Sequence, residues 1–382
     1  MQQPVKQKQV CKACVMDTTD PDISFDENGI CSWCQRWALF RESVPSLSAR
    51  HSVLEERVRA TKEANRDRPY DCLIGLSGGV DSSYVALIVL ELGLRPLAVH
   101  MDGGWNSEIS VSNIEQIVRR LKIDLFTHVV DWEEMKDLQR AMFRAPIVNT
   151  DIPQDHAFVG VLLREAMRRN IKLVITGANW SSEFVLPRAW RGHAANDLDY
   201  LMSVHARFGT QPLKLYPRCS IPMYAYYRLV FGGEAFPILN YMDYDKTKAK
   251  EIIKERLGWH DYGGKHYESL FTKFHQGYYL PRKLGFDKRK AHLSNLIMSG
   301  SISREQAVEE LSVPPLEDTE ARLLLEHVAN KLDLRPDNLD QWLSAPVRDD
   351  SEFKSASKSL LVKCARILGP KRYSRLADFT KS

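Results

Sequence analysis

A loop rich in glycine and serine, SGGVDSS at residues 77–83, has the residue types best suited to chemistry in this chain. It follows a short apolar run and precedes a helical pattern, which is where a phosphate-binding loop lies. The first turn of a helix offers unpaired N–H groups, and glycine has no side chain to block close backbone approach. The loop therefore predicts a phosphate site formed by Ser77, Gly78, Gly79, Ser82 and Ser83.

Asp81 lies in the same loop, although a carboxylate repels phosphate. We therefore assign Asp81 to Mg²⁺ that the phosphates share. The loop is not a Walker motif, because G-x-x-x-x-G-K-[ST] requires a lysine that is missing here. The alternative is an ordinary glycine turn before a helix, but the whole heptapeptide after a predicted strand favours the phosphate site.

Four cysteines form two CxxC pairs, and sixteen residues separate the pairs. Each pair can hold one metal ion from a tight turn, and four thiolates complete a tetrahedral site with no position left for water. We predict a structural Zn²⁺ site, with a rubredoxin-like iron as the alternative. Its ligands are Cys11, Cys14, Cys31 and Cys34. The remaining cysteines, Cys72, Cys219 and Cys364, are isolated and are interpreted as core or surface thiols.

Apolar runs and helical patterns alternate along the first half of the chain. Four runs with the length and boundaries of buried strands occupy residues 70–76, 95–101, 125–131 and 171–177. Helical patterns occupy residues 48–65, 82–92, 113–121, 132–144 and 156–170. This alternation predicts an α/β fold with a doubly wound parallel sheet. Ligands of such sheets bind at the carboxyl ends of the strands, which is where the glycine-serine loop lies.

Changes in these patterns suggest where domains begin and end. Residues 184–240 are rich in aromatics, proline and glycine and give a weak secondary-structure signal, whereas residues 245–257 predict a helix with Asp245 at its N-cap. The rest of the chain is predicted to be helical. We expect a cysteine module, a connecting helix, a nucleotide domain and a helical substrate region at residues 1–40, 41–68, 69–240 and 241–382.

Composition limits the class of protein. The chain has 382 residues, 44% hydrophobic and 27% charged, which is typical of a globular protein. A net charge of +4 is small for a dedicated nucleic-acid binder, so we expect no nucleic acid partner. The polar N-terminus is unlike a signal peptide, and the longest apolar stretch, residues 84–94, falls short of the ~20 residues of a membrane span. We expect a cytoplasmic protein without membrane contact.

The heptapeptide SGGVDSS resembles the signature of the N-type ATP pyrophosphatases, the PP-loop family. The resemblance implies that ATP is cleaved between its α- and β-phosphates and that AMP is transferred to a substrate oxygen. Pyrophosphate would remain in the loop. It also implies that the chain after the second strand contacts adenine, which makes His100 and Met101 adenine neighbours.

Residues 176–183, TGANWSSE, follow the fourth predicted strand. They are similar to a loop of the ammonia-dependent NAD synthetases in which a glutamate holds Mg²⁺. This implies that Glu183 binds Mg²⁺, and that Gly177 and Asn179 lie at the ATP site. The alternative is that Glu183 is a carboxylate stabilised by the dipole at a helix N-terminus.

A stretch at residues 258–311 combines basic side chains with aromatics and the glycine pair of YGGKHYES. Lys265 and His266 could neutralise charge on departing pyrophosphate. Basic side chains further along could hold a substrate phosphate or carboxylate. The candidate catalytic or substrate-binding residues are Lys265, His266, Glu268, Lys273, Lys288 and Arg289. The alternative is that residues 282–290 form a solvated basic helix face.

The cysteine knuckle, SGGVDSS, HMDGGWNS, TGANWSSE and the motifs of residues 258–311 together resemble the N-acetyl sugar amidotransferases of bacterial lipopolysaccharide O-antigen and flagellin-glycan pathways. The resemblance implies that AMP is transferred to the carbonyl oxygen of a sugar acetamido group. Ammonia then displaces it and leaves an acetamidino group. The implied substrate is a nucleotide-linked diacetamido uronic acid or a nonulosonic acid, and the implied cofactors are ATP, Mg²⁺ and structural Zn²⁺.

The ammonia source is expected to be another protein. Position 2 is Gln2 rather than an N-terminal cysteine, and no cysteine lies in a glycine-rich elbow, so the sequence gives no glutaminase signal. The family implies a separate glutaminase and a cyclase-like channel protein, resembling the pair used in histidine biosynthesis.

Two other functions remain open at this point. A tRNA sulfur-transfer enzyme also combines a PP-loop with CxxC knuckles, but it usually needs a cysteine near the ATP site. A zinc-knuckle interaction module with a degenerate nucleotide domain would lack the intact loop. The substrate-reading residues are not assigned, and Asp197, Asp199, His193 and Tyr262 are conceivable.

Overall fold

The structure is a computed structural model that describes residues 9–264 and 267–356. Its centre is a sheet of five parallel strands in the order β3-β2-β1-β4-β5. The strands are β1 (Cys72–Gly75), β2 (Pro96–Asp102), β3 (Asp124–Val129), β4 (Leu173–Thr176) and β5 (Glu234–Pro237). The four predicted strands and their parallel pairing are confirmed.

The fifth strand, β5, lies in the segment where the sequence pattern was weak. It pairs with β4 at the edge of the sheet and has only four residues, EAFP. Glu234 and Pro237 break the apolar run that marks a buried strand, which is why pattern alone did not find it.

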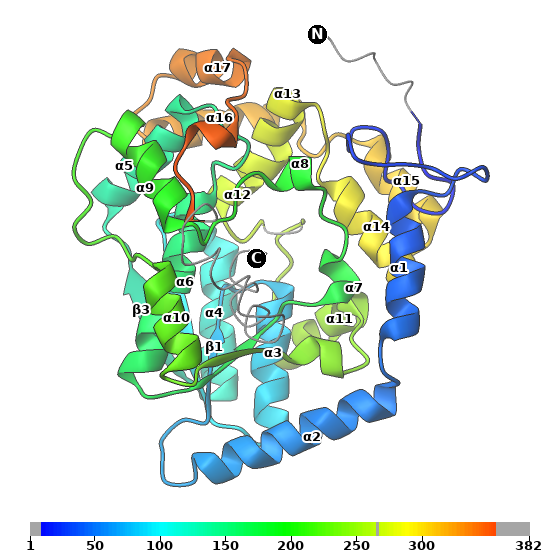
Figure 1. The fold of residues 1–382 in the computed structure, drawn as a ribbon, viewed down its shortest axis with the longest axis vertical. Helices are drawn as coiled ribbons and strands as arrows, with labels where there is room; N and C mark the ends of the chain where they lie inside the picture. Colours follow the sequence, from blue (N-terminus) through cyan, green and yellow to red (C-terminus); the bar gives the residue numbers. More distant parts are fainter. Residues whose placement is uncertain (1–8, 265–266, 357–382) are drawn as a thin grey trace.

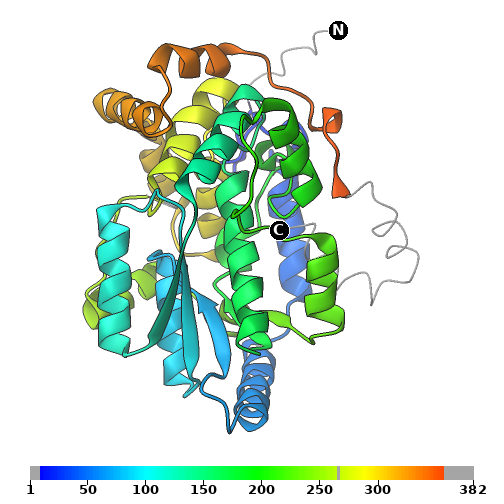
Figure 2. The ribbon, with the colours of Figure 1, turned by 90° about the vertical axis from the view of Figure 1, so that its left-hand side faces the viewer.

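Helices cover both faces of the sheet, as the doubly wound prediction requires (Figure 2). One face packs against α3 (Val80–Glu91), α4 (Glu108–Leu121) and α11 (Lys246–Leu257). The other face packs against α6 (Ile152–Arg168) and α10 (Ile221–Leu229). Because α11 packs on α3, the covering layer continues beyond residue 240. The domain boundaries at residues 40, 68 and 240 therefore remain a proposal.

A helical layer lies beside the end of the sheet that carries the glycine-serine loop (Figure 1). Two antiparallel contacts join it to the chain after β2: Ser107 N donates to Glu268 O, and Leu270 N donates to Trp105 O. The layer contains α5 (Trp132–Arg144), α8 (Arg188–Arg191), α9 (Leu198–Phe208), α12 (Leu270–Phe274), a π-helix (His275–Tyr279), α13 (Leu280–Leu284), α14 (Arg289–Ser299), α15 (Arg304–Ser312), α16 (Asp318–Lys331) and α17 (Pro336–Ser344).

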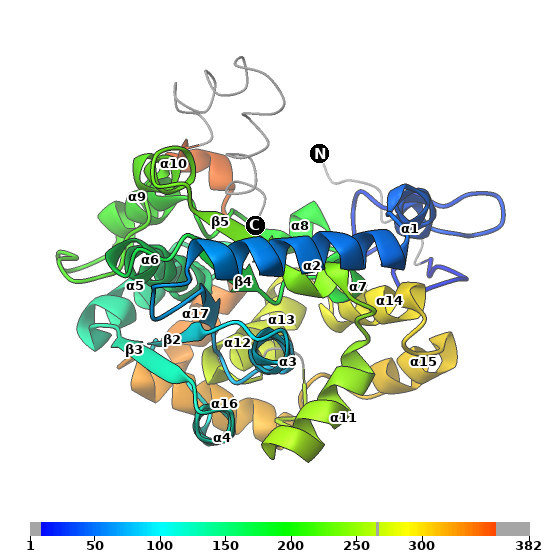
Figure 3. The same ribbon diagram turned by 90° about the horizontal axis from the view of Figure 1, so that it is seen from below.

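The N-terminal part consists of the cysteine loop, α1 (Ser32–Ser43) and α2 (Leu47–Ala64). Helix α2 is the predicted connecting helix, and the Ser46 hydroxyl caps it by accepting from Ala49 N. It lies across the bottom of the molecule, against the 3-10 turn Ile238–Tyr241 (Figure 3). Within the two described ranges, no helix has both the length and the apolar character of a membrane span.

Candidate active site

The glycine-serine loop joins β1 to α3 and has a conformation that needs glycine. Gly78 has a φ of 79°, and a Cβ at this position would lie 2.7 Å from Ser110 O. Trp259 Nε1 donates to Gly78 O at 2.8 Å and fixes the turn from outside. Gly79 is the N-cap of α3, so no side chain at this position covers the N–H groups of the first helical turn.

The hydroxyls of the loop are ordered around the same turn. Ser77 Oγ and Ser82 Oγ lie 3.2 Å apart, and Ser83 Oγ donates to Gly79 O at 2.6 Å. Ser77 and Ser82 line a cavity of about 260 Å³, whereas Ser83 is fully buried behind the loop. The loop thus presents backbone and two hydroxyls to the cavity, and Ser83 stabilises the turn.

Both predicted Mg²⁺ ligands line this first cavity. Asp81 extends from α3 and Glu183 from α7 (Trp180–Glu183), and both are carboxylates, the ligand type that Mg²⁺ prefers. Gly177 brings the two segments together, because its Cβ position would lie only 3.1 Å from Asp81 Cβ. The donor set fits a divalent cation shared with phosphates.

Two residues that the sequence analysis missed contact Asp81. Lys246 Nζ lies 3.0 Å from Asp81 Oδ2, and the Tyr244 hydroxyl donates to Asp81 Oδ1. Burial and the Asp81 charge raise the pKa of Tyr244 far above its ordinary range, so this phenol stays a donor. The predicted cap at Asp245 located the start of α11, but no sequence pattern indicated that the start of this helix faces the glycine-serine loop.

Asn179 makes its observed contacts with the chain on either side of it. Its Oδ1 accepts from Ser182 N at 2.9 Å, and its Nδ2 donates to Gly177 O at 3.0 Å. Asn179 is therefore the N-cap of α7 and lies outside the lining of the first cavity. Its direct role at ATP remains a proposal, and its observed contacts support the shape of the loop.

His100 and Met101 lie at the end of β2 and line a second cavity of about 380 Å³. His100 Nδ1 lies 2.9 Å from Leu76 O, and its Nε2 lies 3.1 Å from Asn106 Nδ2. Burial lowers the pKa of His100, and the carbonyl contact assigns the proton to Nδ1. His100 is thus a neutral side chain that joins the ends of β1 and β2.

The second cavity adjoins the first, because Ser77, Phe158 and Glu268 line both. One wall comes from the sheet edge and the start of α6. The opposite wall comes from the segment after residue 268. The polar and charged side chains of the second cavity include Asn149, Asp151, Gln154, Asp155, Arg191, His193, Thr272, His275, Gln276 and Lys288.

Asp151, Asp155 and Lys288 are three charged groups of this cavity that act on one another. Burial, and then the Asp151 charge, raise the pKa of Asp155 to about 7, while Lys288 partly offsets the shift. The walls of the cavity lie around Asp155, and the side chain itself is exposed to solvent within it. Burial also lowers the pKa of Lys288. A carboxyl group that titrates near neutral pH can accept or donate a proton during a reaction.

A π-helical turn at residues 275–279 supports the same cavity. Such turns are rare and are often found at functional sites. His275 is buried, its Nδ1 lies 2.9 Å from the Thr150 hydroxyl, and burial lowers its pKa to about 3. The imidazole is therefore neutral, and the sequence analysis had no signal for it because a π-turn has no distinct residue pattern.

Glu268 and Tyr262 lie where the two cavities meet. Glu268 Oε1 is 3.0 Å from the Cβ position of Gly79, so this carboxylate lies over the phosphate loop. Burial and the neighbouring Glu268 raise the pKa of Tyr262 above its ordinary range. Both residues were candidates from the sequence, and the structure brings them to the phosphate loop.

Lys273 and Arg289 lie outside both cavities. Lys273 Nζ pairs with Glu320 on α16. Arg289 pairs with Asp287 at 2.7 Å and donates to backbone carbonyls at the end of α15. Basic side chains commonly satisfy such terminal carbonyls. Their placement gives no support to the predicted substrate contacts, because both cations already have protein partners.

The remaining candidates have mixed positions. Lys265 and His266 lie outside the described residues. His193 lines the second cavity, and its Nε2 lies 2.8 Å from Asp197 Oδ2. Asp197 is buried and caps α9, whereas Asp199 is exposed on that helix. Of the three, only His193 faces the cavity directly.

The four cysteines of the two CxxC pairs converge as predicted. Their sulfur atoms all lie within 4.8 Å of one another. The Sγ–Sγ distances include 3.9 Å for Cys11–Cys34, 3.6 Å for Cys14–Cys31 and 3.7 Å for Cys31–Cys34. A tetrahedron with Zn–S bonds of ~2.3 Å has edges of about 3.8 Å. The cluster therefore fits a structural zinc ion.

The fold and the site together define an α/β nucleotide-binding protein of the PP-loop type with a four-cysteine module. Residues 268–366 match the family described as "LPS biosynthesis protein WbpG-like, C-terminal domain". This match supports the family that the motifs indicated. Six residues of the second cavity, Glu268, Ser269, Thr272, His275, Gln276 and Lys288, fall within the matched segment.

Other similarities cover shorter or more distant parts. Glutamine-hydrolysing GMP synthases from two Thermus thermophilus strains are 40% identical over 83 residues, which is 22% of this chain and 16% of each synthase. The chain thus spans about one-sixth of the length of these relatives.

Three solved structures show a distant likeness. NMN synthetase from Francisella tularensis is 13% identical with a TM-score of 0.37 and covers 80% of this chain and 99% of its own. The NH3-dependent NAD synthetase from Campylobacter jejuni is 14% identical with a TM-score of 0.32, covering 75% and 94%. The glutamine-dependent NAD+ synthetase from Acinetobacter baumannii is 16% identical with a TM-score of 0.33, covering 81% and 49%.

Proposed function

We propose that this chain is an ATP-dependent, AMP-forming amidotransferase that converts a sugar acetamido group to an acetamidino group. The observation that carries the proposal is the junction of two cavities at Ser77, Phe158 and Glu268. One cavity contains the phosphate loop, and the other has a wall from the segment that matches the lipopolysaccharide biosynthesis family. This arrangement suits transfer of AMP from a nucleotide to an acceptor that the family-specific segment binds.

The first step joins ATP and the acceptor. The acetamido carbonyl oxygen attacks the α-phosphorus, the bond to the β-phosphate oxygen breaks, and pyrophosphate leaves into the loop. The N-terminus of α3, Ser77 and Ser82 hold the pyrophosphate. Lys246 lines the same cavity and is paired with Asp81. Mg²⁺, held by Asp81 and Glu183, would supply charge neutralisation to the departing pyrophosphate.

The second step adds nitrogen. Ammonia attacks the activated imidate carbon, AMP leaves with the former carbonyl oxygen, and one proton must leave the nitrogen. We assign that proton to Asp155, because its carboxylate faces the second cavity and its pKa is about 7. Lys288 offers a cation to the acceptor or to the departing AMP. No nucleophilic side chain of the protein is needed in either step.

The biological setting is a proposal of the same kind. The family of residues 268–366 supports surface-polysaccharide biosynthesis, with a nucleotide-linked diacetamido uronic acid or a nonulosonic acid as substrate. The matched GMP synthases are glutamine-hydrolysing by name, which supports nitrogen supply as ammonia from glutamine. We propose a separate glutaminase and a cyclase-like protein as partners, and the cytoplasm as the location.

A mass-spectrometric assay tests the proposal. Purified protein is incubated with ATP, Mg²⁺, ammonium and a panel of diacetamido sugars, and wild type is compared with Asp81→Ala. The expected product is about one mass unit lighter than its sugar, because NH replaces O, and it forms together with AMP only in the wild type. AMP formation stimulated by tRNA, without a sugar product, would contradict the proposal.

Sulfur transfer to tRNA is the rival function, and two buried thiols weigh against it. Cys72 and Cys219 are both completely buried, and burial raises the pKa of Cys219 to about 12. A sulfur carrier needs an accessible thiolate. We therefore expect Cys219→Ala to retain amidation activity, whereas loss of AMP formation in a correctly folded variant would favour the rival.

A further inference from the structure

Helix α7, which carries Glu183, is too short to hold its own shape. It has four residues, and isolated helices need about 12–15 residues to be even marginally stable in water. Its N-terminus is fixed by Asn179 and by Asn240, whose Oδ1 accepts from Trp180 N at 3.1 Å. The position of the Glu183 end must therefore come from contacts with other elements.

Asn295 on α14 forms hydrogen bonds with the backbone on both sides of Glu183. Its Nδ2 donates to Ser182 O at 3.1 Å, and its Oδ1 accepts from Val185 N at 2.7 Å. Asn295 is only 2% exposed, so these two bonds are shielded from competing water. The Asn295 side chain thus fixes the backbone immediately before and after Glu183.

Aromatic side chains of α1 enclose the same segment from another side. Phe184, the residue after Glu183, contacts Trp37 at 5.0 Å and Phe40 at 5.2 Å between ring centroids. Phe40 also contacts Trp180 at the other end of α7, at 5.5 Å. Helix α1 begins directly after Cys31 and contains Cys34, so its position depends on the four-cysteine module.

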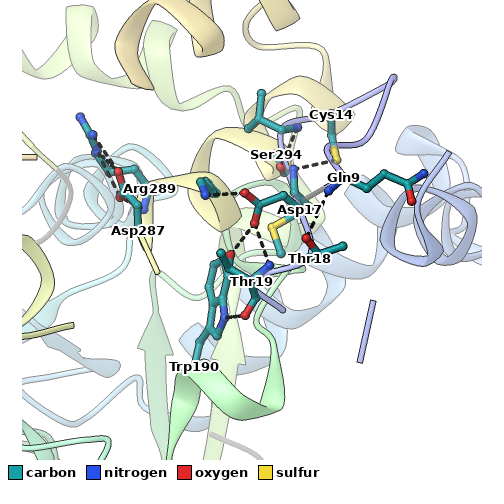
Figure 4. A network of polar contacts seen from close by, with 12 residues as sticks. Gln9, Cys14, Asp17, Thr18, Thr19, Trp190, Asp287, Arg289 and Ser294 are labelled. Carbon is teal, nitrogen blue, oxygen red and sulfur yellow. Dashed lines mark hydrogen bonds and ion pairs between the residues drawn. The ribbon is translucent and has the colours of Figure 1, made fainter. Parts of the chain in front are cut away.

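The same module is bound to α14. Val15 N donates to Ser294 Oγ at 3.3 Å, next to Asn295, and Lys290 Nζ pairs with the buried Asp17 at 2.6 Å. Figure 4 shows Asp17 and Ser294 where the cysteine loop meets this helix. Trp37 Nε1 also donates to Met298 O at 2.8 Å, which links α1 directly to α14. The two elements that hold α7 are therefore joined through the cysteine module.

We propose that the four-cysteine module, α1 and α14 form a clamp that holds Glu183 at the ATP cavity, with Asn295 as its positioning residue. The four cysteines would hold a metal ion that keeps the module folded, and the contacts of α1 and α14 would then fix the backbone around Glu183. This inference rests on the proposed function in one respect, namely that Glu183 binds the Mg²⁺ of Mg–ATP. The module then has a role at the ATP cavity in addition to its own stability.

The first experiment uses Asn295→Asp, which keeps the size and the acceptor but replaces the donor to Ser182 O. ATP binding is measured by calorimetry as Mg²⁺ is varied. We expect the half-saturating Mg²⁺ concentration to rise about 10- to 100-fold, as for other partners that orient metal ligands, with Mg²⁺-free ATP binding unchanged. Asn330→Asp, the same change on the exposed side of α16, should behave as wild type.

The outcomes separate the clamp from the function. Wild-type Mg²⁺ dependence in folded Asn295→Asp would overturn the clamp. Absence of Mg²⁺-dependent ATP binding in the wild type would instead overturn the proposed function. Phe184→Leu, which weakens the α1 side of the clamp, gives a second variant and should shift Mg²⁺ dependence in the same direction.

Hydrogen exchange tests the clamp without ATP. Amide exchange is followed by mass spectrometry in the full chain before and after removal of the cysteine-bound metal with a chelator. We expect exchange at residues 180–185 to become at least about tenfold faster, while β1 and α3 stay protected. Faster exchange confined to residues 9–34, with residues 180–185 unchanged, would contradict the proposal.

Discussion

Lys246 Nζ lies 3.0 Å from Asp81 Oδ2, although 165 residues separate them in the chain. The glycine-serine loop has no lysine of its own, unlike a Walker loop. Helix α11 instead places an ammonium group at the start of α3, beside the cavity that the loop lines. The site thus has a cation at the phosphate loop that comes from a different part of the chain.

Replacing this lysine should impair chemistry more than folding. Lys246→Met keeps the length of the side chain and removes the charge. We expect kcat for pyrophosphate release to fall about 100-fold, because one group that stabilises the leaving charge is lost. Lys248→Met, on an exposed position of the same helix, is the control and should remain close to wild type. Equal rates in the two variants would show that Lys246 does not stabilise the leaving pyrophosphate.

The carboxyl pair in the second cavity should control the pH dependence of amidation. Asp155 has a pKa of about 7 and accepts a proton only when ionised, so the rate should rise with pH through that value. Asp151→Asn removes the like charge that raises the pKa, and the midpoint should move down by about one unit. The pH–rate profile at saturating ammonia checks this. In Asp155→Asn, the rise of the rate with pH should be absent.

A midpoint that stays at the same pH in Asp151→Asn would show that another group sets the profile. An upward shift of the midpoint would lead to the same conclusion, because loss of a negative neighbour cannot raise the pKa of a carboxyl group through charge.

The ion pair between Asp17 and Lys290 should contribute to stability. Burial raises the pKa of Asp17, but Lys290 and Thr19 more than offset this, so its pKa lies below the ordinary value. Asp17→Asn leaves Lys290 without its charge partner and should destabilise the chain by about 3 kcal/mol, as for other broken buried pairs. Thermal unfolding at neutral pH measures the loss, and the exposed Asp22→Asn on the same loop is the control.

The pH dependence of this ion pair has a definite sign. A carboxyl group with a depressed pKa in the folded state stabilises the protein above its unfolded pKa of about 3.9. That stabilisation is lost as the pH falls through the folded pKa, so the difference between wild type and Asp17→Asn should shrink only in acid. A difference that grows as the pH falls would contradict the assignment.

The cysteine cluster should contain a metal ion in the purified protein. We expect about one Zn²⁺ per chain by elemental analysis, and its loss in Cys14→Ser, because four thiolates complete the tetrahedron. Cys72→Ser changes a buried thiol of the sheet and should keep the metal. Iron in place of zinc would leave the ligand set intact and change only the identity of the ion.

Much of the fold was predictable from local pattern. Strands β1 to β4, helix α5 and the cap at Asp245 follow from apolar periodicity and from residues with narrow conformational preferences. Strand β5 was not predictable, because a four-residue edge strand has too few apolar positions to show a period. Its place is decided by pairing with β4 rather than by its own residues.

The sequence by itself determined the phosphate loop and the four-cysteine cluster, because in both the functional groups lie close together in the chain and the spacing encodes the geometry. Only the tertiary structure decided which distant side chains reach them. It brought Lys246, Asp155 and His275 to the cavities and gave Lys273 and Arg289 protein partners elsewhere. Such side chains are placed by the packing of helices on one another, and helix packing depends on contacts between segments that no local pattern records.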